Sequence, residues 1–402
     1  MTTDGSLIKY PPPAPGSPSD PEPELYELLR TRRVMQAALP DGSTGWLVGG
    51  YDEVRQLLSD QRFSRALAAA PGHAAQGIEL SAADTIAGMD PPEHTRLRKL
   101  VASAFTARRV EAMRPRVAAI VGELIDGFTA GPQPADLVTA FSLPLPVRVI
   151  CEMLGVPAAD LDKFHAWTSA LVADWQLDIA EIMTALIELN SYFAELIAAK
   201  RAQPGDDLLS ALIEARDSGD RLSEQELTRL GSTILVGGYE TTTNQISLSL
   251  VVLLDHPAEL ARLRADSGLI PAAVEELLRY VRLTGGASLA RITTEDVELG
   301  GVTIPAGEVV LPILPLANRD QLAYSDPDRF DIGRAPVSHL AFGGGFHHCL
   351  GAQLARVELQ EAVRGLLARL PGLALAVPAD QLTFKLGMAI HNLSELPATW
   401  TG

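Results

Sequence analysis

Along most of this chain, hydrophobic positions recur among polar ones with the period of a helix. Apolar residues recur at intervals of three and four, the spacing of a helix that buries one face. These stretches cover about residues 112–128, 143–154, 161–174 and 181–201. Short apolar runs bounded by glycine or proline predict strands instead, at 46–48, 287–292, 297–299, 302–304 and 309–314. The pattern predicts a mainly α protein with small β-sheets.

The longest predicted helix begins at a capping box. Ser223 and Glu226 have the spacing at which each side chain bonds the other's backbone N–H, and the helix continues until His256-Pro257. About thirty residues is far above the usual eleven or twelve. Its centre reads Gly237-Gly238-Tyr239-Glu240-Thr241-Thr242. Because glycine inside a helix costs about 1 kcal/mol relative to alanine, this pair requires a steric reason.

A glycine-rich loop carries the cysteine most suited to chemistry. Residues 342–351 read Phe-Gly-Gly-Gly-Phe-His-His-Cys-Leu-Gly, and a helix is predicted over 352–370. The glycines permit backbone conformations with positive φ and allow a flat cofactor to approach the main chain. The N–H groups at the helix start favour a thiolate at Cys349. A zinc site at His347, His348 and Cys349 is the competing interpretation, but adjacent residues rarely point at one tetrahedral centre. Cys151, in an apolar helix, is expected to be a buried core residue.

Two further helices carry charged pairs at helical spacing. Asp90-Pro91-Pro92-Glu93 predicts a helix start, after which His94 and Arg98 share one face. Such a pair either covers a solvated surface or donates hydrogen bonds to an anion. A second helix over 272–281 follows Pro271 and carries Glu276 and Arg279 three residues apart, a spacing that also occurs in ordinary surface ion pairs.

Composition limits the partners and the cellular location. The 402 residues carry a net charge of −17, so nucleic acid and anionic membranes are poor partners, although 96–116 is locally rich in arginine. Two cysteines make no disulfide framework, and neither a signal peptide nor an apolar run of membrane-spanning length is evident, so a soluble cytoplasmic protein is expected. Residues 1–22 are proline-rich and predicted flexible, followed by a single domain over 23–402.

In their order along the chain these motifs resemble those of the cytochrome P450 superfamily, which has a triangular, mainly helical fold. Within it the chain looks like a soluble bacterial haem-thiolate monooxygenase. The resemblance implies haem b (iron protoporphyrin IX) with Cys349 as the iron ligand, and Glu240 and Thr241 as the acid and alcohol of oxygen activation. Gly237 and Tyr239 depart from the Ala and His commoner in bacterial relatives. The resemblance also implies propionate donors, namely His94, Arg98, Arg291 and His347. It further implies a buried structural set made of Glu276, Arg279 and Arg329.

The expected reaction is insertion of one atom of O2, by hydroxylation or epoxidation, into an apolar small molecule such as a polyketide, terpenoid or peptide secondary metabolite. Electrons would come from NAD(P)H through a ferredoxin reductase and a ferredoxin, docking near residues 96–116, Arg356 and Arg364; a monomer is expected. By resemblance the substrate pocket is lined by Ile86, Ala87, Leu171, Val172, Val236, Gly237, Leu289 and Ile390.

Other functional classes remain open at this point. A peroxygenase using hydrogen peroxide, or a haem sensor or carrier without turnover, would not need the pair Glu240–Thr241. A haem isomerase or dehydratase would not need Thr241.

Overall fold

The computed structural model describes most of the chain. The described residues are 7–10, 23–39, 41–70, 84–102, 105–161, 163–164, 166–167, 179–217, 222–284, 289–335, 338–385 and 390–401. Two compact units are present, each assembled from separate stretches of sequence. The first consists of Met1–Gln76, Leu248–Cys349 and Ala389–His391, and the second of Gly77–Ser247, Leu350–Met388 and Asn392–Gly402. Because these stretches interleave, the division does not follow successive sequence domains.

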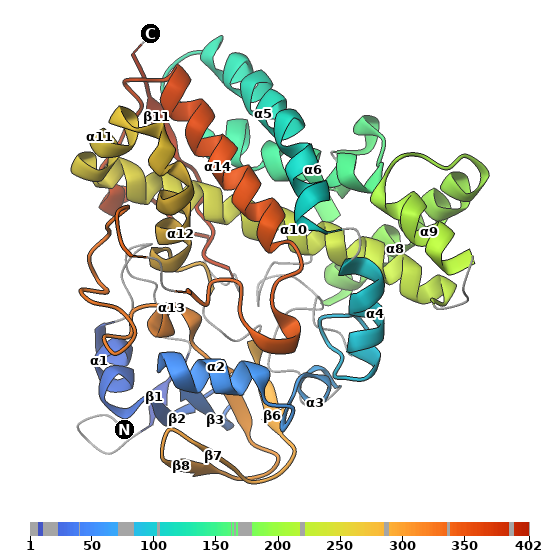
Figure 1. The fold of residues 1–402 in the computed structure, drawn as a ribbon, viewed down its shortest axis with the longest axis vertical. Helices are drawn as coiled ribbons and strands as arrows, with labels where there is room; N and C mark the ends of the chain where they lie inside the picture. The colour runs from blue at the N-terminus through green and yellow to red at the C-terminus, as the bar shows by residue number, and fades with distance from the viewer. Residues whose placement is uncertain are drawn as a thin grey trace. The chain divides into compact units, whose positions relative to one another are not determined.

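The described part of the first unit contains a mixed sheet and several helices (Figure 1). The sheet has the strand order β1-β2-β3-β9-β6-β4, and β7 pairs with β8 in a separate hairpin. The strands are β1 (Ile8–Lys9), β2 (Val34–Ala38), β3 (Thr44–Val48), β4 (Phe63–Ser64), β6 (Arg291–Thr293), β7 (Val297–Leu299), β8 (Val302–Ile304) and β9 (Val309–Pro312). The α-helices are α1 (Pro23–Arg32), α2 (Tyr51–Ser59), α3 (Arg65–Ala69), α11 (Pro257–Ala265), α12 (Ile270–Tyr280) and α13 (Leu314–Ala317).

The N-terminal segment departs from the expectation of a flexible start. Ile8 and Lys9 form β1, which pairs parallel to β2 with Ile8 opposite Ala37. Ile8 and Tyr10 are buried, 8% and 4% exposed. Two apolar side chains before the proline-rich tract are therefore enough to attach this piece to the sheet, whereas residues 11–22 lie outside the described residues.

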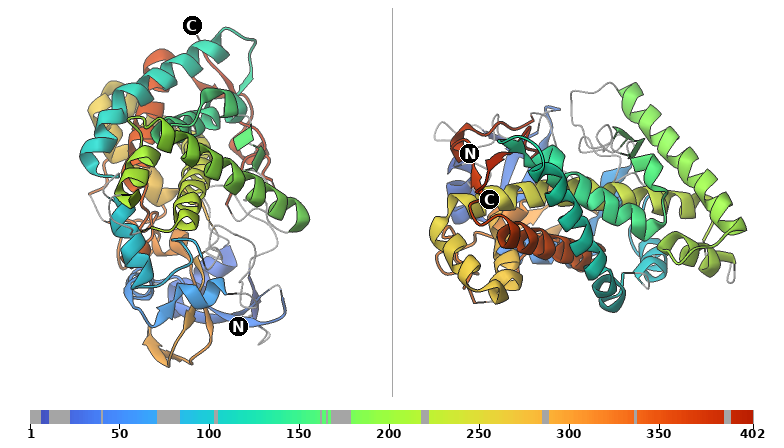
Figure 2. Two further views of the ribbon diagram at one scale, coloured as in Figure 1. Left: turned by 90° about the vertical axis from the view of Figure 1, so that its right-hand side faces the viewer. Right: turned by 90° about the horizontal axis from the view of Figure 1, so that it is seen from above.

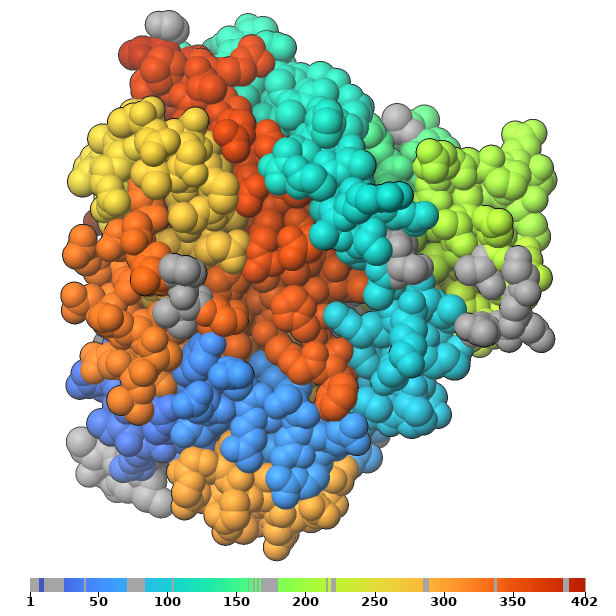
Figure 3. All heavy atoms as spheres, in the orientation of Figure 1, coloured from blue at the N-terminus to red at the C-terminus, as the bar shows by residue number. Residues whose placement is uncertain are grey.

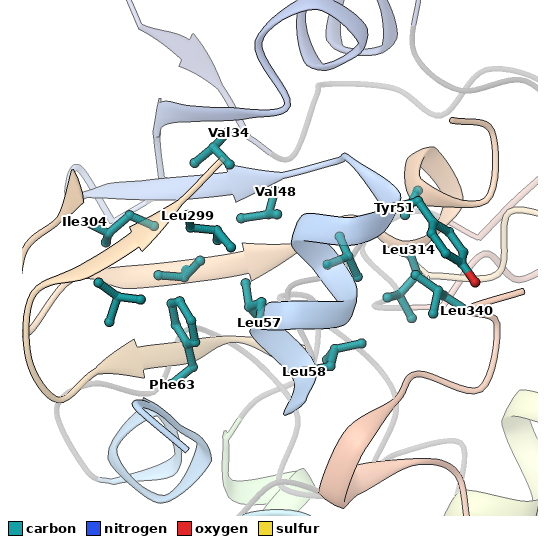
Figure 4. Close-up of a cluster of buried hydrophobic side chains, with 14 of the residues drawn as sticks. Val34, Val48, Tyr51, Leu57, Leu58, Phe63, Leu299, Ile304, Leu314 and Leu340 are labelled. Carbon is teal, nitrogen blue, oxygen red and sulfur yellow. The ribbon is translucent and has the colours of Figure 1, made fainter. Parts of the chain in front are cut away.

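The core of the first unit forms where α2 lies on the sheet (Figure 4). Leu57 and Leu58 of α2 pack among side chains from the strands, including Val48 of β3 and Phe63 of β4. Leu299 and Ile304 of the hairpin complete one end of this cluster. The α2 helix begins at Tyr51, directly after the Gly49-Gly50 pair. The core thereby fixes the end of α2. The cysteine loop described below packs against this end.

The second unit is predominantly helical in its described part. Its helices are α4 (Glu93–Ala102), α5 (Ala107–Thr129), α6 (Pro144–Leu154), α8 (Ile179–Ala202), α9 (Leu208–Asp217), α10 (Glu224–Asp255, in this unit as far as Ser247) and α14 (Ala352–Arg369). A small sheet has the order β10 (Ala374–Leu375), β11 (Pro397–Thr399) and β5 (Ala135–Asp136). Short helical turns lie at Val138–Ser142, Ala158–Asp160 and Ala379–Gln381.

Helix α14 packs along α5 (Figures 1 and 2), and the two form neighbouring strips of the surface in Figure 3. Gly365 permits this close approach, since a Cβ there would lie 2.4 Å from Val121. Arg114 Nη1 contacts Glu361 Oε1 at 2.7 Å across the same interface. The helix after the cysteine loop is therefore held along its length.

Helix α10 has the predicted capping box and length. Ser223 N donates to Glu226 Oε2 at 2.7 Å, and Glu226 N donates to Ser223 Oγ at 3.1 Å. It contacts α8, where Ser232 Oγ donates to Asn190 Oδ1 at 2.9 Å. A Cβ at Gly231 would lie 2.6 Å from Phe193. The capping box and α8 thus fix the first half of α10.

Helix α8 corrects one expectation from the sequence. By length and composition Ala180–Ala202 is apolar enough to cross a membrane, although the sequence analysis found no such run. A single helix of this kind is weak evidence, because core helices of soluble proteins pass the same test. Its inward face carries the buried Leu189 and Phe193, whereas Glu181 and Glu188 are exposed. Leu189 and Phe193 thus bury one face of the helix within its unit, whereas 22% of the apolar stretch as a whole is buried and Met183 and Ile187 are exposed.

Candidate functional site

The loop that presents Cys349 is a tight, hydrogen-bonded structure in the first unit. Gly343 N donates to Leu340 O at 2.8 Å, and Cys349 N donates to Phe342 O at 2.9 Å. Between them, Gly345–His347 forms one 3₁₀ turn. Gly343 and Gly345 have φ of 67° and 60°, in the left-handed region that favours glycine. The Cys349 side chain is exposed at the end of this loop.

Gly345 is required by packing against the protein itself. A Cβ at this position would lie 2.0 Å from Leu58 O and 2.8 Å from Ser59 Cα, at the end of α2. A Cβ at Gly343 would have no neighbour within 4 Å, so the requirement for glycine there is conformational alone. The positive φ predicted for this glycine run is present at Gly343 and Gly345. In addition, Gly345 lies against the end of α2, a contact that was not predicted.

The two cysteines lie in opposite environments. Burial raises the pKa of the Cys151 thiol to about 12, and the negative charge of Asp160 adds to the effect. Cys151 is 2% exposed in α6, as expected for a core residue.

Within the described ranges, no group of three or more His, Cys, Asp or Glu residues could hold a metal ion. The zinc interpretation therefore gains no support from His347, His348 and Cys349.

The centre of α10 is exposed on one face although its neighbours are buried. Leu235, Val236 and Tyr239 are 0–3% exposed, whereas Gly237 is exposed and Thr241 is half-buried. A Cβ at Gly237 would have no neighbour within 4 Å, so this face opens onto space. One turn on, Thr241 Oγ1 donates to Gly237 O at 2.7 Å.

Gly238 has a separate reason to be glycine. A Cβ there would lie 3.1 Å from Ile150 Cδ1 of α6, which is tighter than ordinary van der Waals contact. The two glycines of the pair therefore have different steric roles. Gly237 leaves space on the open face, and Gly238 allows α10 to pack against α6.

Glu240 is a buried acid whose carboxyl group has amide partners. It is 5% exposed, and its Oε1 accepts a hydrogen bond from Asn244 Nδ2 at 3.2 Å and one from Asn392 Nδ2 at 2.5 Å. Burial raises the pKa of Glu240, while Asn244, the positive charge of Lys385 and Asn392 oppose that shift. Glu240 was predicted from the sequence, whereas neither amide was. Asn244 could have been found from its i, i+4 spacing, whereas nothing local indicates Asn392.

Cationic side chains gather on β6 and α3 in the first unit. Arg291 is 3% exposed, and its Nη1 donates to Leu289 O at 2.7 Å and to Ala290 O at 3.1 Å. Arg65, which the sequence analysis missed, is 5% exposed and also donates to Ala290 O, at 2.9 Å. Two buried guanidinium groups at one carbonyl oxygen concentrate positive charge, which suits an anionic ligand group. The signal in the sequence was an arginine immediately after a strand and an N-cap serine, Ser64.

The other predicted propionate donors lie on separate elements. His94 is 2% exposed on α4 of the second unit, and Arg98, one turn later, is half-buried. The expected shared face of this pair is therefore directed partly inward. His347 is half-buried in the turn that precedes Cys349.

The predicted pocket residues have differing environments. Ile86 and Ala87 are half-buried and Val236 is 3% exposed, all in the second unit. Ile390 is 3% exposed and pairs with Thr284 through an isolated bridge in the first unit. Leu289 packs against the α2 core, which gives it a structural contact of its own. Leu171 and Val172 lie outside the described residues.

The buried ion pair of α12 is present, but its third member differs from the expectation. Arg279 Nε and Nη2 each lie 2.8 Å from a carboxylate oxygen of Glu276, and both side chains are almost fully buried. Arg334 completes the set, with Nε at 3.0 and 3.1 Å from the two oxygens. Arg329 was the predicted third member, but its side chain is 65% exposed and faces Asp331. Only its backbone carbonyl reaches Arg279, at 3.3 Å.

Comparison with known proteins places this arrangement in a family. The sequence model of the family "Cytochrome P450" matches residues 146–370. Nocardicin C N-oxygenase of Nocardia uniformis subsp. tsuyamanensis is 46% identical over 382 residues, 95% of this chain and 96% of that protein. Mycinamicin IV hydroxylase/epoxidase of Micromonospora griseorubida is 47% identical over 374 residues, covering 93% and 94%.

A solved structure agrees over nearly the whole chain. The LnmA cytochrome P450 hydroxylase of the leinamycin pathway of Streptomyces atroolivaceus superposes with a TM-score of 0.90 at 44% identity, covering 98% of this chain and 100% of that one. The mainly α fold with small sheets and the family expected from the sequence are thus confirmed. The chain belongs to the cytochrome P450 family.

Proposed function

We propose that this cytochrome P450 monooxygenase inserts one atom of O2 into an apolar small molecule of secondary metabolism, by hydroxylation or epoxidation. One observation carries the proposal: the Cys349 side chain is exposed at the end of a hydrogen-bonded glycine loop. Independently, in the second unit, α10 exposes the Gly237–Thr241 face at its centre. A thiol donor and an alcohol beside open space are the two groups that haem-thiolate oxygen chemistry requires of a protein.

The residues fit a haem. An exposed thiol supplies the iron ligand, and the helix that starts at Ala352 favours its thiolate form. Arg291, with the neighbouring Arg65, offers buried positive charge for a propionate. We assign His94, Arg98 and His347 to the same task. When bound, haem b supplies the redox chemistry that activates O2 with two electrons.

The chain's own residues control protons. Thr241 Oγ1 already donates its hydrogen to Gly237 O, so its lone pairs are available to accept a hydrogen bond on the open face. Glu240, next to it in the chain, holds a carboxyl group whose raised pKa favours the protonated, proton-donating form more than in an exposed glutamate. We assign proton supply to Glu240 and orientation at the reacting centre to Thr241.

The substrate class is inferred from the relatives. Their names assign nocardicin C and mycinamicin IV to two proteins that are 46% and 47% identical to this chain. Those names describe N-oxygenation in one case and hydroxylation or epoxidation in the other, so the shared element is oxygen insertion. We infer a polyketide, terpenoid or peptide natural product, contacted through Ile86, Ala87, Leu171, Val172, Val236, Gly237, Leu289 and Ile390.

Electrons are assigned to external carriers. We propose NAD(P)H, a ferredoxin reductase and a ferredoxin as the electron path to a monomeric, cytoplasmic enzyme. The buried Glu240 and its neighbour Thr241 support use of O2 and two protons, which a peroxide-driven peroxygenase or a haem sensor would not need.

The test is the carbon monoxide difference spectrum of the dithionite-reduced protein. A Soret band at the position diagnostic of a thiolate opposite the bound gas is expected, and Cys349→His should move it to the position of a histidine-ligated haem. Cys151→Ser is the matched control and should leave the spectrum unchanged. A wild-type spectrum of the histidine type in freshly folded protein would contradict the proposal.

A further inference from the structure

The carboxyl group of Glu240 is approached by two amides from distant parts of the second unit. Asn244 follows it by one turn of α10, and its Nδ2 also donates to Glu240 O at 2.9 Å. Asn392 belongs to the C-terminal segment, 152 residues further along the chain. Glu240, Asn244 and Asn392 are 5%, 2% and 4% exposed. These bonds therefore form away from solvent, where each is difficult to replace by water.

Both amides bond the same carboxyl oxygen. Asn244 and Asn392 each donate to Oε1, and among the residues that the structure describes none donates to Oε2. A carboxyl oxygen that accepts two N–H donors has both lone-pair directions in use, so a proton there would displace a donor. The proton of a neutral Glu240 is therefore expected on Oε2.

The backbone holds Asn392 in this position. Lys385 N donates to Asn392 O at 2.8 Å, and Ser394 N donates to Thr383 O at 2.9 Å, which pairs the two sides of this segment. Leu393, the next residue, is fully buried. The amide has one productive orientation, because only its nitrogen can donate to a carboxylate. Asn392 is thus fixed both by its backbone and by its chemistry.

The charges around Glu240 oppose one another. Burial disfavours the carboxylate, whereas the two amides and the positive charge of Lys385 stabilise it. The amides and Lys385 therefore act against the effect of burial, so that loss of the proton is easier than burial alone would allow.

We propose that Asn392, with Asn244, pins Oε1 of Glu240 so that Oε2 is the oxygen that releases and takes up the proton used in oxygen activation. Asn392 is a positioning residue, since it acts through Glu240. The inference rests on the proposed function, because it concerns the proton that Glu240 delivers. It assigns the C-terminal segment a part in proton supply.

The experiment combines Asn392→Leu, which has similar size and no donor, with Glu240→Gln and the double variant, all as holoenzymes. Ser394→Ala, in the same segment but exposed, is the matched control. The first readout is the infrared C=O stretch of the protonated carboxyl group, followed against pH and identified by its loss in Glu240→Gln. The second is the product formed per NAD(P)H consumed with surrogate ferredoxin and reductase and a substrate found by screening.

Asn392→Leu should lower the proton dissociation constant of Glu240 by about tenfold or more, because a donor to the carboxylate is lost. Product per NAD(P)H should fall toward that of Glu240→Gln, and in the Glu240→Gln background the second change should add nothing. Asn392→Asp, which preserves shape, should lower the dissociation constant further and supplies the test if the leucine variant does not fold.

An unchanged carboxyl titration in both Asn392 variants would overturn the proposal. An equal loss of coupling in the Glu240→Gln background would also overturn it, because Asn392 would then act independently of the acid. Failure of the proposed function is distinguishable: it would show as a carbon monoxide spectrum without thiolate, while the infrared titration still decides whether Asn392 controls Glu240.

Discussion

The hydroxyl group of Thr241 has two roles. It makes a hydrogen bond within the helix, and it is the group proposed to act in the reaction. A threonine inside a helix commonly donates to the carbonyl four residues earlier, and Thr241 does so with Gly237 O at 2.7 Å. Because Gly237 has no side chain, the same hydroxyl oxygen remains accessible on the open face. The glycine and the threonine thus form one local unit, in which the backbone bond fixes the direction of the remaining lone pairs.

Replacing Thr241 tests this unit. Thr241→Ala should retain haem and substrate binding, but product per NAD(P)H should fall by at least about tenfold, with the electrons recovered as peroxide or water. Thr241→Ser, which keeps the hydroxyl group, should retain most of the coupling. Full coupling in the alanine variant would rule out the proposed role and would favour an isomerase or dehydratase, for which this residue is expendable.

Glu358 is a second buried acid, and we expect it to affect the stability of the fold and its dependence on pH. It is 2% exposed on α14, its Oε2 has no hydrogen-bond partner among the described residues, and burial raises its pKa from 4.5 to about 8. The native state therefore binds the proton more tightly than the unfolded chain does. Between pH 4.5 and about 8 the free energy of unfolding contributed by this group falls as pH rises, by up to roughly 1.4 kcal/mol per pH unit.

Glu358→Gln should remove this pH dependence. Relative to wild type, the variant should gain stability steadily from pH 5.5 to 7.5, since its neutral amide carries no cost of burying a charge. Urea unfolding midpoints of both proteins across this range provide the measurement. Parallel pH profiles would show that Glu358 is neutralised by a partner in the native state.

At the scale of elements, the ion pair of α12 depends on a loop that the sequence did not identify correctly. Glu276 and Arg279 lie three apart on one helix, which is enough to predict their contact. Their third partner comes from a turn some fifty residues later, where both Arg329 and Arg334 are available. The turn at Asp331, whose carboxylate accepts from Gly333 N at 2.9 Å, directs Arg334 toward Glu276 and leaves Arg329 outside.

The two arginines form a matched pair for mutation. Arg334→Ala should lower the free energy of unfolding by about 3–5 kcal/mol, because it removes one cation from a buried carboxylate. Arg329→Ala should change it by less than about 0.5 kcal/mol, since the side chain is 65% exposed and only its backbone carbonyl is used. Thermal unfolding of both variants measures the difference. Equal losses would return Arg329 to the role first assigned to it.

The elements that the sequence predicted best were those with local signals. The capping box of α10 and the apolar period of α5 correctly located both helices, and α5 extends back to Ala107 because Thr106 caps its start. The strand expected over 309–314 ends at Pro312, since α13 begins two residues later. The two residues of β1 were missed because so short a strand has no period to detect.

The site residues that were predicted from the sequence also lie in local motifs, and those that were missed depend on contacts with distant parts of the chain. Cys349 and the Glu240–Thr241 pair were found from contiguous motifs. Asn392 and Arg65 were not, because each acquires its partner from sequence more than a hundred residues away. For Asn392 the sequence contains no local signal, since any buried amide would fit the local pattern equally well; for Arg65 the N-cap Ser64 marks its position but not its partner.

At the scale of the whole molecule, the net charge of −17 makes the few uncompensated cations important for an acidic redox partner. Several predicted docking arginines already have acidic neighbours: Arg96 pairs with Glu226, and Arg116 with Glu123 and Glu152. Arg364 lies 3.6 Å from Glu361. By contrast, Lys99, Arg108 and Arg109 are exposed on α4 and the start of α5, and no ion pair within the described residues includes them. Within the predicted docking region, the cations without an ion pair among the described residues therefore include Lys99, Arg108 and Arg109.

This contrast yields a charge-reversal test of ferredoxin docking. Arg109→Glu should raise the ferredoxin concentration needed for half-maximal reduction by about tenfold at low salt, because it reverses an uncompensated charge on the surface proposed to attract an acidic partner. The effect should shrink as salt screens the surface.

Arg116→Glu is the control: it reverses a charge already neutralised by Glu123 and Glu152, so a much smaller change in ferredoxin dependence is expected. Stopped-flow reduction of the haem at several ionic strengths gives both quantities, with thermal unfolding to verify that each variant is folded. If Arg116→Glu weakened reduction as much as Arg109→Glu, docking would depend on total charge, and the local surface of Lys99, Arg108 and Arg109 would have no special part in it.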